Sequence, residues 1–171
     1  MDTIETQRLT LRGWLESDAQ DFYEYAKHPE VGLNGGWPPH TSQEVSLETI
    51  KYFINEADIW AVVLKESGKV IGSVGLHKDA KRPNIAVKEL GFVLGAAYWG
   101  QGLATEASKA LIEYGFSTMG LDLISTYHKT FNLRAKRVIE KCGFTLEGVL
   151  RQASKRYDGL IFDAACYSLL K

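Results

Sequence analysis

Cysteine and histidine are scarce in this sequence, and neither residue type is clustered. The two cysteines, Cys142 and Cys166, lie apart without a CxxC or zinc-ligand spacing, which argues against a disulfide framework and favours a reducing compartment. The four histidines are scattered and form no HExxH motif, so no metal site is expected.

Long apolar runs are also missing. No stretch approaches the roughly 20 residues of a transmembrane helix, and no signal peptide precedes Met1. We therefore expect a cytoplasmic protein with no membrane partner.

An excess of charge of either sign is absent as well. Lysine and arginine number 20 against 21 aspartates and glutamates, which gives a formal net charge of −1. No global basic field attracts nucleic acid, so a nucleic-acid partner is not expected. An anionic ligand would have to be held by local dipoles and a few basic side chains.

The remaining composition is that of an ordinary soluble protein, with 45% hydrophobic and 24% charged residues. A chain of 171 residues can bury a substantial core and is expected to form one domain, residues 1–171.

Apolar patterning and turn residues predict an alternation of strands and helices. Strands are predicted at residues 8–12, 59–65, 69–77, 87–94, 123–128, 144–151 and 160–170. Helices are predicted from the caps Ser17 and Asp18 to residue 28, from Thr41 and Ser42 through Ile54, and at 103–119 and 132–141. Residues 31–40, rich in Gly and Pro, predict a loop.

The helix at 103–119 connects two strands as a crossover, which makes those strands parallel. The predicted fold class is therefore α/β of the α+β type: a mixed, mostly antiparallel sheet with a central parallel β-α-β crossover and helices on both faces.

Residues 89–107 (ELGFVLGAAYWGQGLATEA) predict a strand, a glycine loop and a helix. A helix that opens after closely spaced glycines presents free N–H groups and a positive dipole end, which favours a phosphate ligand. A Walker A loop is disfavoured, because Gln101 and Gly102 stand where that motif needs Lys and Ser/Thr. A dinucleotide loop is disfavoured by Thr105 at its third small position and by a following strand that ends without a carboxylate.

Residues 99–104 (WGQGLA) resemble the acyl-CoA pyrophosphate loop, Gln/Arg-x-x-Gly-x-Gly/Ala, of the GNAT superfamily of N-acetyltransferases. Residues 132–144 (NLRAKRVIEKCGF) resemble its second signature, Asn-x-x-Ser/Ala on a short helix ending in Gly-Phe. The opening segment 5–12 (ETQRLTLR) and the closing segment 146–151 (LEGVLR) are similar to the RimJ/RimL-like branch, which acetylates ribosomal-protein N-termini. The resemblance covers essentially the whole chain.

This resemblance implies the GNAT fold, in which two central parallel strands splay and admit the pantetheine arm of acetyl-CoA. Acetyl-CoA is then the co-substrate, with the backbone of the glycine loop holding its pyrophosphate. The implied cofactor-binding residues are Phe92, Leu94, Trp99, Gly100, Gln101, Gly102, Leu103, Ala104, Thr105 and Asn132. Trp99 stands where the family usually has Gln or Arg, which removes a side-chain contact but leaves the backbone cradle.

Glu89 is the candidate general base. By resemblance it occupies the position of a carboxylate that removes a proton from the acceptor amine in several family members, and a carboxylate can also bind an ammonium. The alternative is a solvated or ion-paired glutamate with no catalytic part.

The general acid is harder to assign. The position of the usual tyrosine is Ile139, and that of the serine used by some RimL-like members is Ala135. Tyr127 is a substitute by location, with a buried sheet tyrosine as the alternative. A thiolate is also a tolerable leaving group, so a dedicated acid is not required.

Three further assignments stay open at the sequence level. Trp37 either lines the acceptor pocket or plugs a Gly/Pro loop, and the basic residues of 134–141 either contact the CoA 3′-phosphate or form a solvated face. The acceptor is a protein N-terminal amine or a small amine such as a polyamine, amino acid or antibiotic.

A CoA-binding module with little turnover is the non-enzymatic alternative. Dimers are common in this branch, so a homodimer is one of the assemblies that the resemblance allows.

Overall fold

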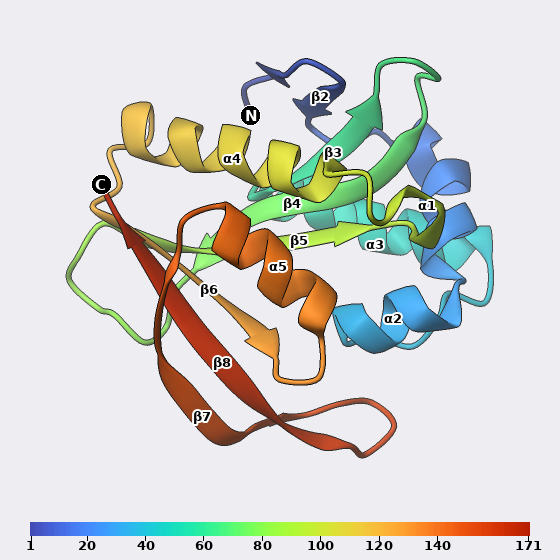
Figure 1. The fold of residues 1–171 in the computed structure, drawn as a ribbon. Coiled ribbons are helices and arrows are strands. Elements are labelled where there is room, and N and C mark those ends of the chain that lie inside the picture. The colour runs from blue at the N-terminus through green and yellow to red at the C-terminus, as the bar shows by residue number, and fades with distance from the viewer.

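The computed structural model describes residues 1–171 and contains one eight-stranded sheet with helices on both faces (Figure 1). The strands are β1 (Ile4–Glu5), β2 (Leu9–Arg12), β3 (Ile59–Leu64), β4 (Val70–Lys78), β5 (Val87–Leu94), β6 (Leu123–Lys129), β7 (Thr145–Lys155) and β8 (Ile161–Leu170). The helices are α1 (Ala19–Ala26), α2 (Pro29–Gly35), α3 (Gln43–Glu56), α4 (Leu103–Ser117) and α5 (Leu133–Lys141), with short 3-10 turns at Glu16–Asp18 and Ala96–Tyr98.

The sheet order is β1-β2-β3-β4-β5-β6-β8-β7. Neighbouring strands are antiparallel everywhere except between β5 and β6, which α4 joins as a crossover. The predicted mixed sheet with a central parallel pair is therefore confirmed. β8 lies between β6 and β7, so the C-terminal hairpin extends the sheet beyond its parallel centre.

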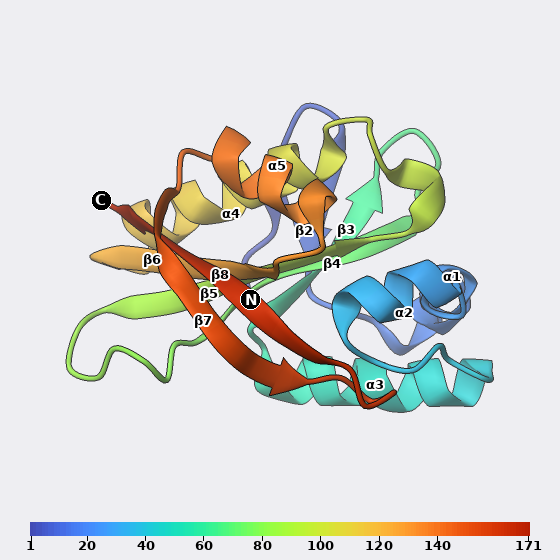
Figure 2. The same cartoon turned by 60° about the horizontal axis from the view of Figure 1, so that its bottom comes forward.

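The helices divide between the two faces of the sheet, with α4 and α5 on one face and α1, α2 and α3 on the other (Figure 2). Residues Leu103, Ala107 and Leu111 recur every four positions on α4 and are buried in the larger hydrophobic core. The smaller core under α1 and α3 combines aliphatic residues with three buried aromatic rings, of which Trp14 and Phe22 are in contact. None of the helices combines the length and hydrophobicity that a transmembrane span requires.

The parallel strands β5 and β6 separate soon after they begin. Their register contains three pairs, Val87 with Leu123, Lys88 with Ile124 and Glu89 with Ser125. Beyond Glu89, β5 continues along β4, and β6 continues along β8, so that the two strands diverge (Figure 1). This divergence opens a gap in the middle of the sheet.

The prediction of a loop over residues 31–40 is wrong in its first half, because α2 spans Pro29–Gly35. Pro29 occupies the first turn of this helix, where its missing N–H costs nothing, and Gly36 ends the helix in a left-handed conformation with φ of 100°. The Gly and Pro residues therefore mark the two ends of a short helix.

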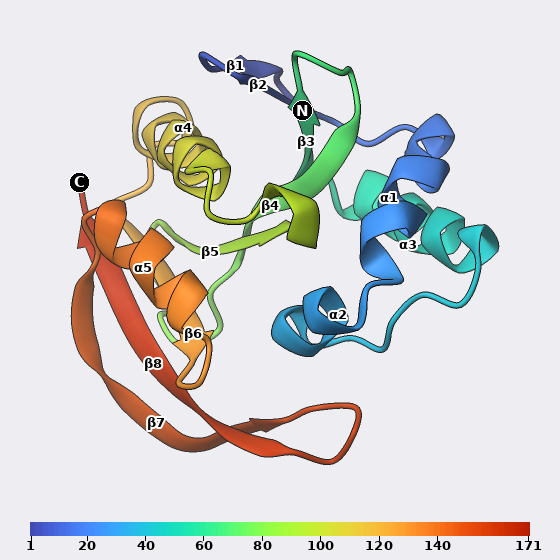
Figure 3. The same cartoon turned by 45° about the vertical axis from the view of Figure 1, so that its right-hand side comes forward.

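The C-terminal end of α2 is held by a cation from β6. The Lys129 ammonium donates to the carbonyls of Asn34 (2.7 Å) and Leu33 (3.3 Å), and Arg156 also donates to the Leu33 carbonyl. Burial, followed by the nearby Arg156 charge, lowers the pKa of Lys129 to about 8. These bonds fix α2 opposite α5, across the open ends of β5 and β6 (Figure 3).

Candidate active site

The glycine loop before α4 leaves a continuous run of backbone donors free. Gly100 and Gly102 adopt φ of 77° and 79°, a region that disfavours side chains. The N–H groups of residues 100–105 donate to no acceptor in the protein. Because these donors lie at the N-terminus of α4, the helix dipole adds to their attraction for an anion.

The gap between β5 and β6 exposes backbone groups of β5. The carbonyl of Leu90 accepts from Thr126 Oγ1 on β6 at 2.9 Å, whereas the N–H of Gly95 donates to Ile71 on β4. Since backbone polar groups alternate sides along a strand, those of Phe92 and Leu94 face the gap with Leu90. The Leu94 carbonyl is taken by the Trp99 indole N–H at 2.8 Å, which leaves its N–H available.

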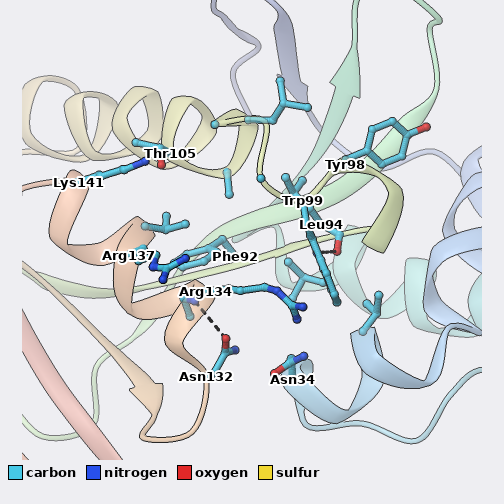
Figure 4. Close-up of a pocket in the computed structure, with 18 of the residues that line it drawn as sticks. Asn34, Phe92, Leu94, Tyr98, Trp99, Thr105, Asn132, Arg134, Arg137 and Lys141 are labelled. Atoms are coloured by element: carbon cyan, nitrogen blue, oxygen red, sulfur yellow. Dashed lines mark hydrogen bonds between the residues drawn. The ribbon is translucent and has the colours of Figure 1, made fainter.

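A cavity of about 360 Å³ lies on the β5 side of this gap, bordered by the glycine loop, β5, α2 and α5 (Figure 4). Three cations of α5 line it, Arg134, Arg137 and Lys141. The Arg134 guanidinium stacks on the Trp99 ring, with its carbon 4.5 Å from the ring centroid. The Arg134 guanidinium therefore places a positive charge beside the glycine loop, although Trp99 stands where the family usually has Gln or Arg.

Asn132 lies at the junction of the gap with a second cavity. Its Oδ1 accepts the N–H of Ala135 at 3.1 Å and caps α5. Its Nδ2 is left without a protein partner. The side chain can therefore serve as a helix cap and present a donor to a ligand at the same time.

The second cavity, hereafter the cleft, has a volume of about 480 Å³ and adjoins the first, because several residues border both. These shared residues are Asn34, Gly35, Phe92, Val93, Asn132 and Ala135. Aromatic rings form much of the wall of the cleft, from Phe22, Trp37, Tyr52, Phe53, Phe92 and Tyr127. The Trp37 ring packs on Gly35 and leaves no room there for a Cβ atom.

Glu89 and Tyr127 both border the cleft at the point where β5 and β6 separate. The Glu89 carboxylate accepts from Lys81 Nζ at 2.9 Å, and the same ammonium lies 5.7 Å from the centroid of the Tyr127 ring. Tyr127 is 42% exposed, so the alternative of a buried sheet tyrosine is wrong. Desolvation, followed by the Glu89 charge, raises the pKa of Tyr127, which keeps its phenol protonated at neutral pH.

The loop that carries Lys81 is anchored by the buried carboxylate of Asp79. This carboxylate accepts from the N–H of Lys81 (2.6 Å), from Ser125 Oγ (2.7 Å) and from Arg82 (2.9 Å). Burial alone would raise the pKa of Asp79, but the hydrogen bonds from Ser125, Lys81 and Arg82 outweigh it and lower the pKa. Because Ser125 is the register partner of Glu89, this anchor fixes Lys81 beside Glu89.

Comparison with known proteins gives consistent matches along the chain. A family model described as an acetyltransferase (GNAT) domain matches residues 8–145. The uncharacterized N-acetyltransferase p20 of Bacillus licheniformis is 32% identical over 177 residues, which cover 100% of this chain and 97% of that protein.

The chain belongs to the GNAT family of acetyltransferases. A GNAT-family acetyltransferase from Bacillus anthracis has the same fold, with a TM-score of 0.89 at 24% identity over 99% of this chain and 98% of the other. The microcin C7 self-immunity acetyltransferase MccE, solved with acetyl-CoA and AMP, has a TM-score of 0.83 at 26% identity and covers 97% and 94%. Acetyl-CoA is the co-substrate of the family, and the protein is an N-acetyltransferase.

The residues of this GNAT domain suit the chemistry of acetyl-CoA. Six consecutive free N–H groups, from Gly100 to Thr105, and three cations match the charge of a pyrophosphate and a further phosphate. The backbone groups of Phe92 and the N–H of Leu94, which face the gap, match the amides of a pantetheine arm. No group of three or more His, Cys, Asp or Glu side chains is arranged to hold a metal ion.

The structure brings the predicted site residues together. The predicted residues of the glycine loop and β5 border the gap together with Asn132, whereas Glu89, Tyr127 and Trp37 border the cleft. The exception is the Gln101 side chain, which donates to the Ala97 carbonyl and does not line the gap.

Sequence reasoning missed the residues that surround Glu89. Asp79, Lys81 and Ser125 belong to a loop and a neighbouring strand, and their only sequence signal is the charged segment DAKR at 79–82. Such a segment also occurs on any solvated loop, so its link to Glu89 becomes visible only in three dimensions. Ile139 is buried in the core and cannot replace the missing tyrosine of α5.

The buried Asp79 carboxylate predicts a pH-dependent loss of stability. Folding lowers the pKa of Asp79. The carboxylate therefore contributes to the free energy of unfolding above its unfolded pKa of about 3.9, and this contribution is lost as the pH falls through the lower folded pKa. At pH 7, Asp79→Asn should lower the free energy of unfolding by about 1 to 3 kcal/mol in urea titrations. This difference from the unsubstituted protein should shrink as the pH approaches 3; a difference that stays constant would contradict the assigned role.

Proposed function

We propose that this protein transfers the acetyl group of acetyl-CoA directly to an α-amine at a protein N-terminus, as a RimJ/RimL-like member of the family. The observation that supports the transfer is the pair of adjoining cavities, one bordered by the free N–H groups of the glycine loop and the other by Glu89. The resemblance of segments 5–12 and 146–151 to the RimJ/RimL-like branch supports the acceptor class.

The binding part of the proposal assigns each portion of acetyl-CoA to groups that match it. The N–H groups of residues 100–105 hold the pyrophosphate, and Arg134, Arg137 and Lys141 neutralise the phosphates. The backbone of Phe92 and Leu94 bonds the pantetheine amides, and Asn132 Nδ2 donates to the same arm. The thioester then lies near Glu89, where β5 and β6 begin to separate.

The chemical part assigns the proton transfers to two side chains. The Glu89 carboxylate accepts a proton from the acceptor ammonium, directly or through water, and the neutral amine attacks the thioester carbonyl. The carbon–sulfur bond breaks as the carbon–nitrogen bond forms, and the Tyr127 phenol donates its proton to the departing thiolate.

The charge of the cleft supports an acceptor with a single amine. Glu89 is the only carboxylate that borders the cleft, and the remaining wall is mostly neutral and aromatic. A polyamine carries further ammonium groups, and each of them would need a carboxylate partner on desolvation. An N-terminal residue needs one carboxylate for its amine and an apolar wall for its side chain.

A small-molecule α-amine is the second candidate acceptor. MccE, which shares 26% identity with this chain, was solved with AMP as well as acetyl-CoA. The aromatic rings of Trp37, Tyr52 and Tyr127 at the cleft could stack on a planar group of that kind.

Release of free CoA in the presence of acceptor pools tests the acceptor class. We expect turnover with a pool of N-terminal peptides and little with a pool of polyamines, because the cleft offers one carboxylate. The same peptides with a blocked α-amine serve as the control and should give no turnover. Turnover with polyamines alone would contradict the proposal, whereas turnover with a pool of small-molecule α-amines alone would favour the second candidate.

Substitution of Glu89 tests the proposed base. Glu89→Gln keeps the shape of the side chain but cannot accept a proton, so kcat should fall on the order of 10²- to 10⁴-fold. The acetyl-CoA dissociation constant, measured by calorimetry, should change little. Glu48→Gln, at an exposed glutamate of α3, is the matched control and should keep full activity. An unchanged kcat for Glu89→Gln would exclude Glu89 as the base.

Substitution of Gly102 tests the proposed phosphate cradle. Gly102→Val adds a branched side chain where the pyrophosphate would approach, so acetyl-CoA should no longer raise the melting temperature. Gly68→Val in the β3–β4 turn is the matched control, because Gly68 has a similar φ of 71° and an open surrounding. Both substitutions should cost about 1 to 2 kcal/mol of stability from the left-handed backbone. Retained acetyl-CoA binding by Gly102→Val would exclude the loop.

A further inference from the structure

Lys81 places a primary amine where the proposed mechanism requires the amine of the acceptor. Its Nζ lies 2.9 Å from the Glu89 carboxylate, which is hydrogen-bonding distance for a group that gives up a proton. The ammonium also faces the Tyr127 ring, 5.7 Å from its centroid. Lys81 therefore contacts both residues to which the proton transfers are assigned.

The position of Lys81 is fixed by buried structure. Its backbone N–H donates to the Asp79 carboxylate, which also accepts from Ser125 on β6. Arg82, the next residue, bridges Asp79 and Glu147. Three hydrogen bonds to the buried Asp79 carboxylate, one of them from the Lys81 backbone, therefore anchor the loop from which the Lys81 side chain reaches Glu89.

The gap can bring an acetyl group to this amine. Along β5, the distance from Leu94 beside the glycine loop to Glu89 is five residues, or about 17 Å at the rise of a strand. This is comparable to the length of an extended pantetheine arm. A thioester whose pyrophosphate lies at the loop would end beside Glu89, and hence beside Lys81 Nζ.

We propose that Lys81 is an acceptor of this enzyme's own acetyl transfer, so that the protein acetylates itself at Lys81. This inference rests on the proposed function. The Lys81 ammonium gives a proton to Glu89, its nitrogen attacks the thioester carbonyl, and the carbon–sulfur bond breaks. The products are an Nζ-acetyl amide and free CoA, whose thiolate takes up a proton.

Acetylation at this position changes the site. The amide nitrogen of acetyl-lysine carries no charge, so it cannot form the ion pair that now occupies Glu89. The carboxylate becomes free to bind the ammonium of an external acceptor. Before modification, an acceptor must displace Lys81 from Glu89.

Intact-protein mass spectrometry with peptide mapping tests this inference after incubation with acetyl-CoA. Lys51 is the matched internal control, because its side chain is 44% exposed and pairs with Glu48 at 2.8 Å, against 46% and 2.9 Å for Lys81 and Glu89. We expect Lys81 to be acetylated at least about tenfold faster than Lys51, with a first-order rate that does not depend on protein concentration. Glu89→Gln and Gly102→Val should each reduce the rate at Lys81 to that of Lys51.

Acetylation of Lys81 at the same rate as Lys51 would be non-enzymatic modification and overturns the inference. Acetylation of Lys81 at an unchanged rate in both variants overturns it for the same reason. An unmodified Lys81 in a protein that turns over N-terminal peptides also overturns it and leaves the proposed function intact. An unmodified Lys81 together with no CoA release from any acceptor pool, while acetyl-CoA still raises the melting temperature, overturns both.

Discussion

The divergence of two parallel strands is the constraint on which the rest of the site depends. β5 and β6 share a register of three pairs and then separate, each continuing along a different neighbour. A sheet rarely leaves backbone groups of two central strands unpaired, because each buried and unpaired group costs free energy. Here the unpaired groups face two adjoining cavities, one at the glycine loop and one at Glu89, and a ligand with amides of its own can satisfy them. The same divergence places Glu89 at the last shared pair, where an inserted arm must end.

Local charge replaces a global field in this protein. The net charge is −1, yet the gap gathers the N-terminus of α4 and three cations from α5. The cleft beyond it has one carboxylate among mostly neutral and aromatic side chains. The two halves of the cavity therefore differ in electrostatic character, with an anion-binding end and an end suited to one amine. Lys81 pairs with the carboxylate of that second end, Glu89, and Asp79 anchors the backbone of Lys81.

Much of this arrangement could be predicted from sequence because its signals are local. The end of β5 before Gly95 and the start of α4 after the glycines at 100 and 102 follow from local sequence signals, and the structure agrees with both. The short helix α2 was missed because the Gly and Pro residues at its ends are also typical of a loop. The partners of Glu89 were missed for a different reason, since Lys81 precedes it in a loop and Ser125 comes from another strand. Tertiary packing alone makes them neighbours, and it also leaves Tyr127 exposed at the cleft.

A crystal structure of the protein with acetyl-CoA tests the central claim most directly. The account predicts pyrophosphate oxygens within hydrogen-bonding distance of the N–H groups of residues 100–105. It also predicts the pantetheine arm between β5 and β6, with the sulfur atom beside Glu89. A pyrophosphate bound away from the glycine loop, or an arm that lies outside the gap, would contradict it.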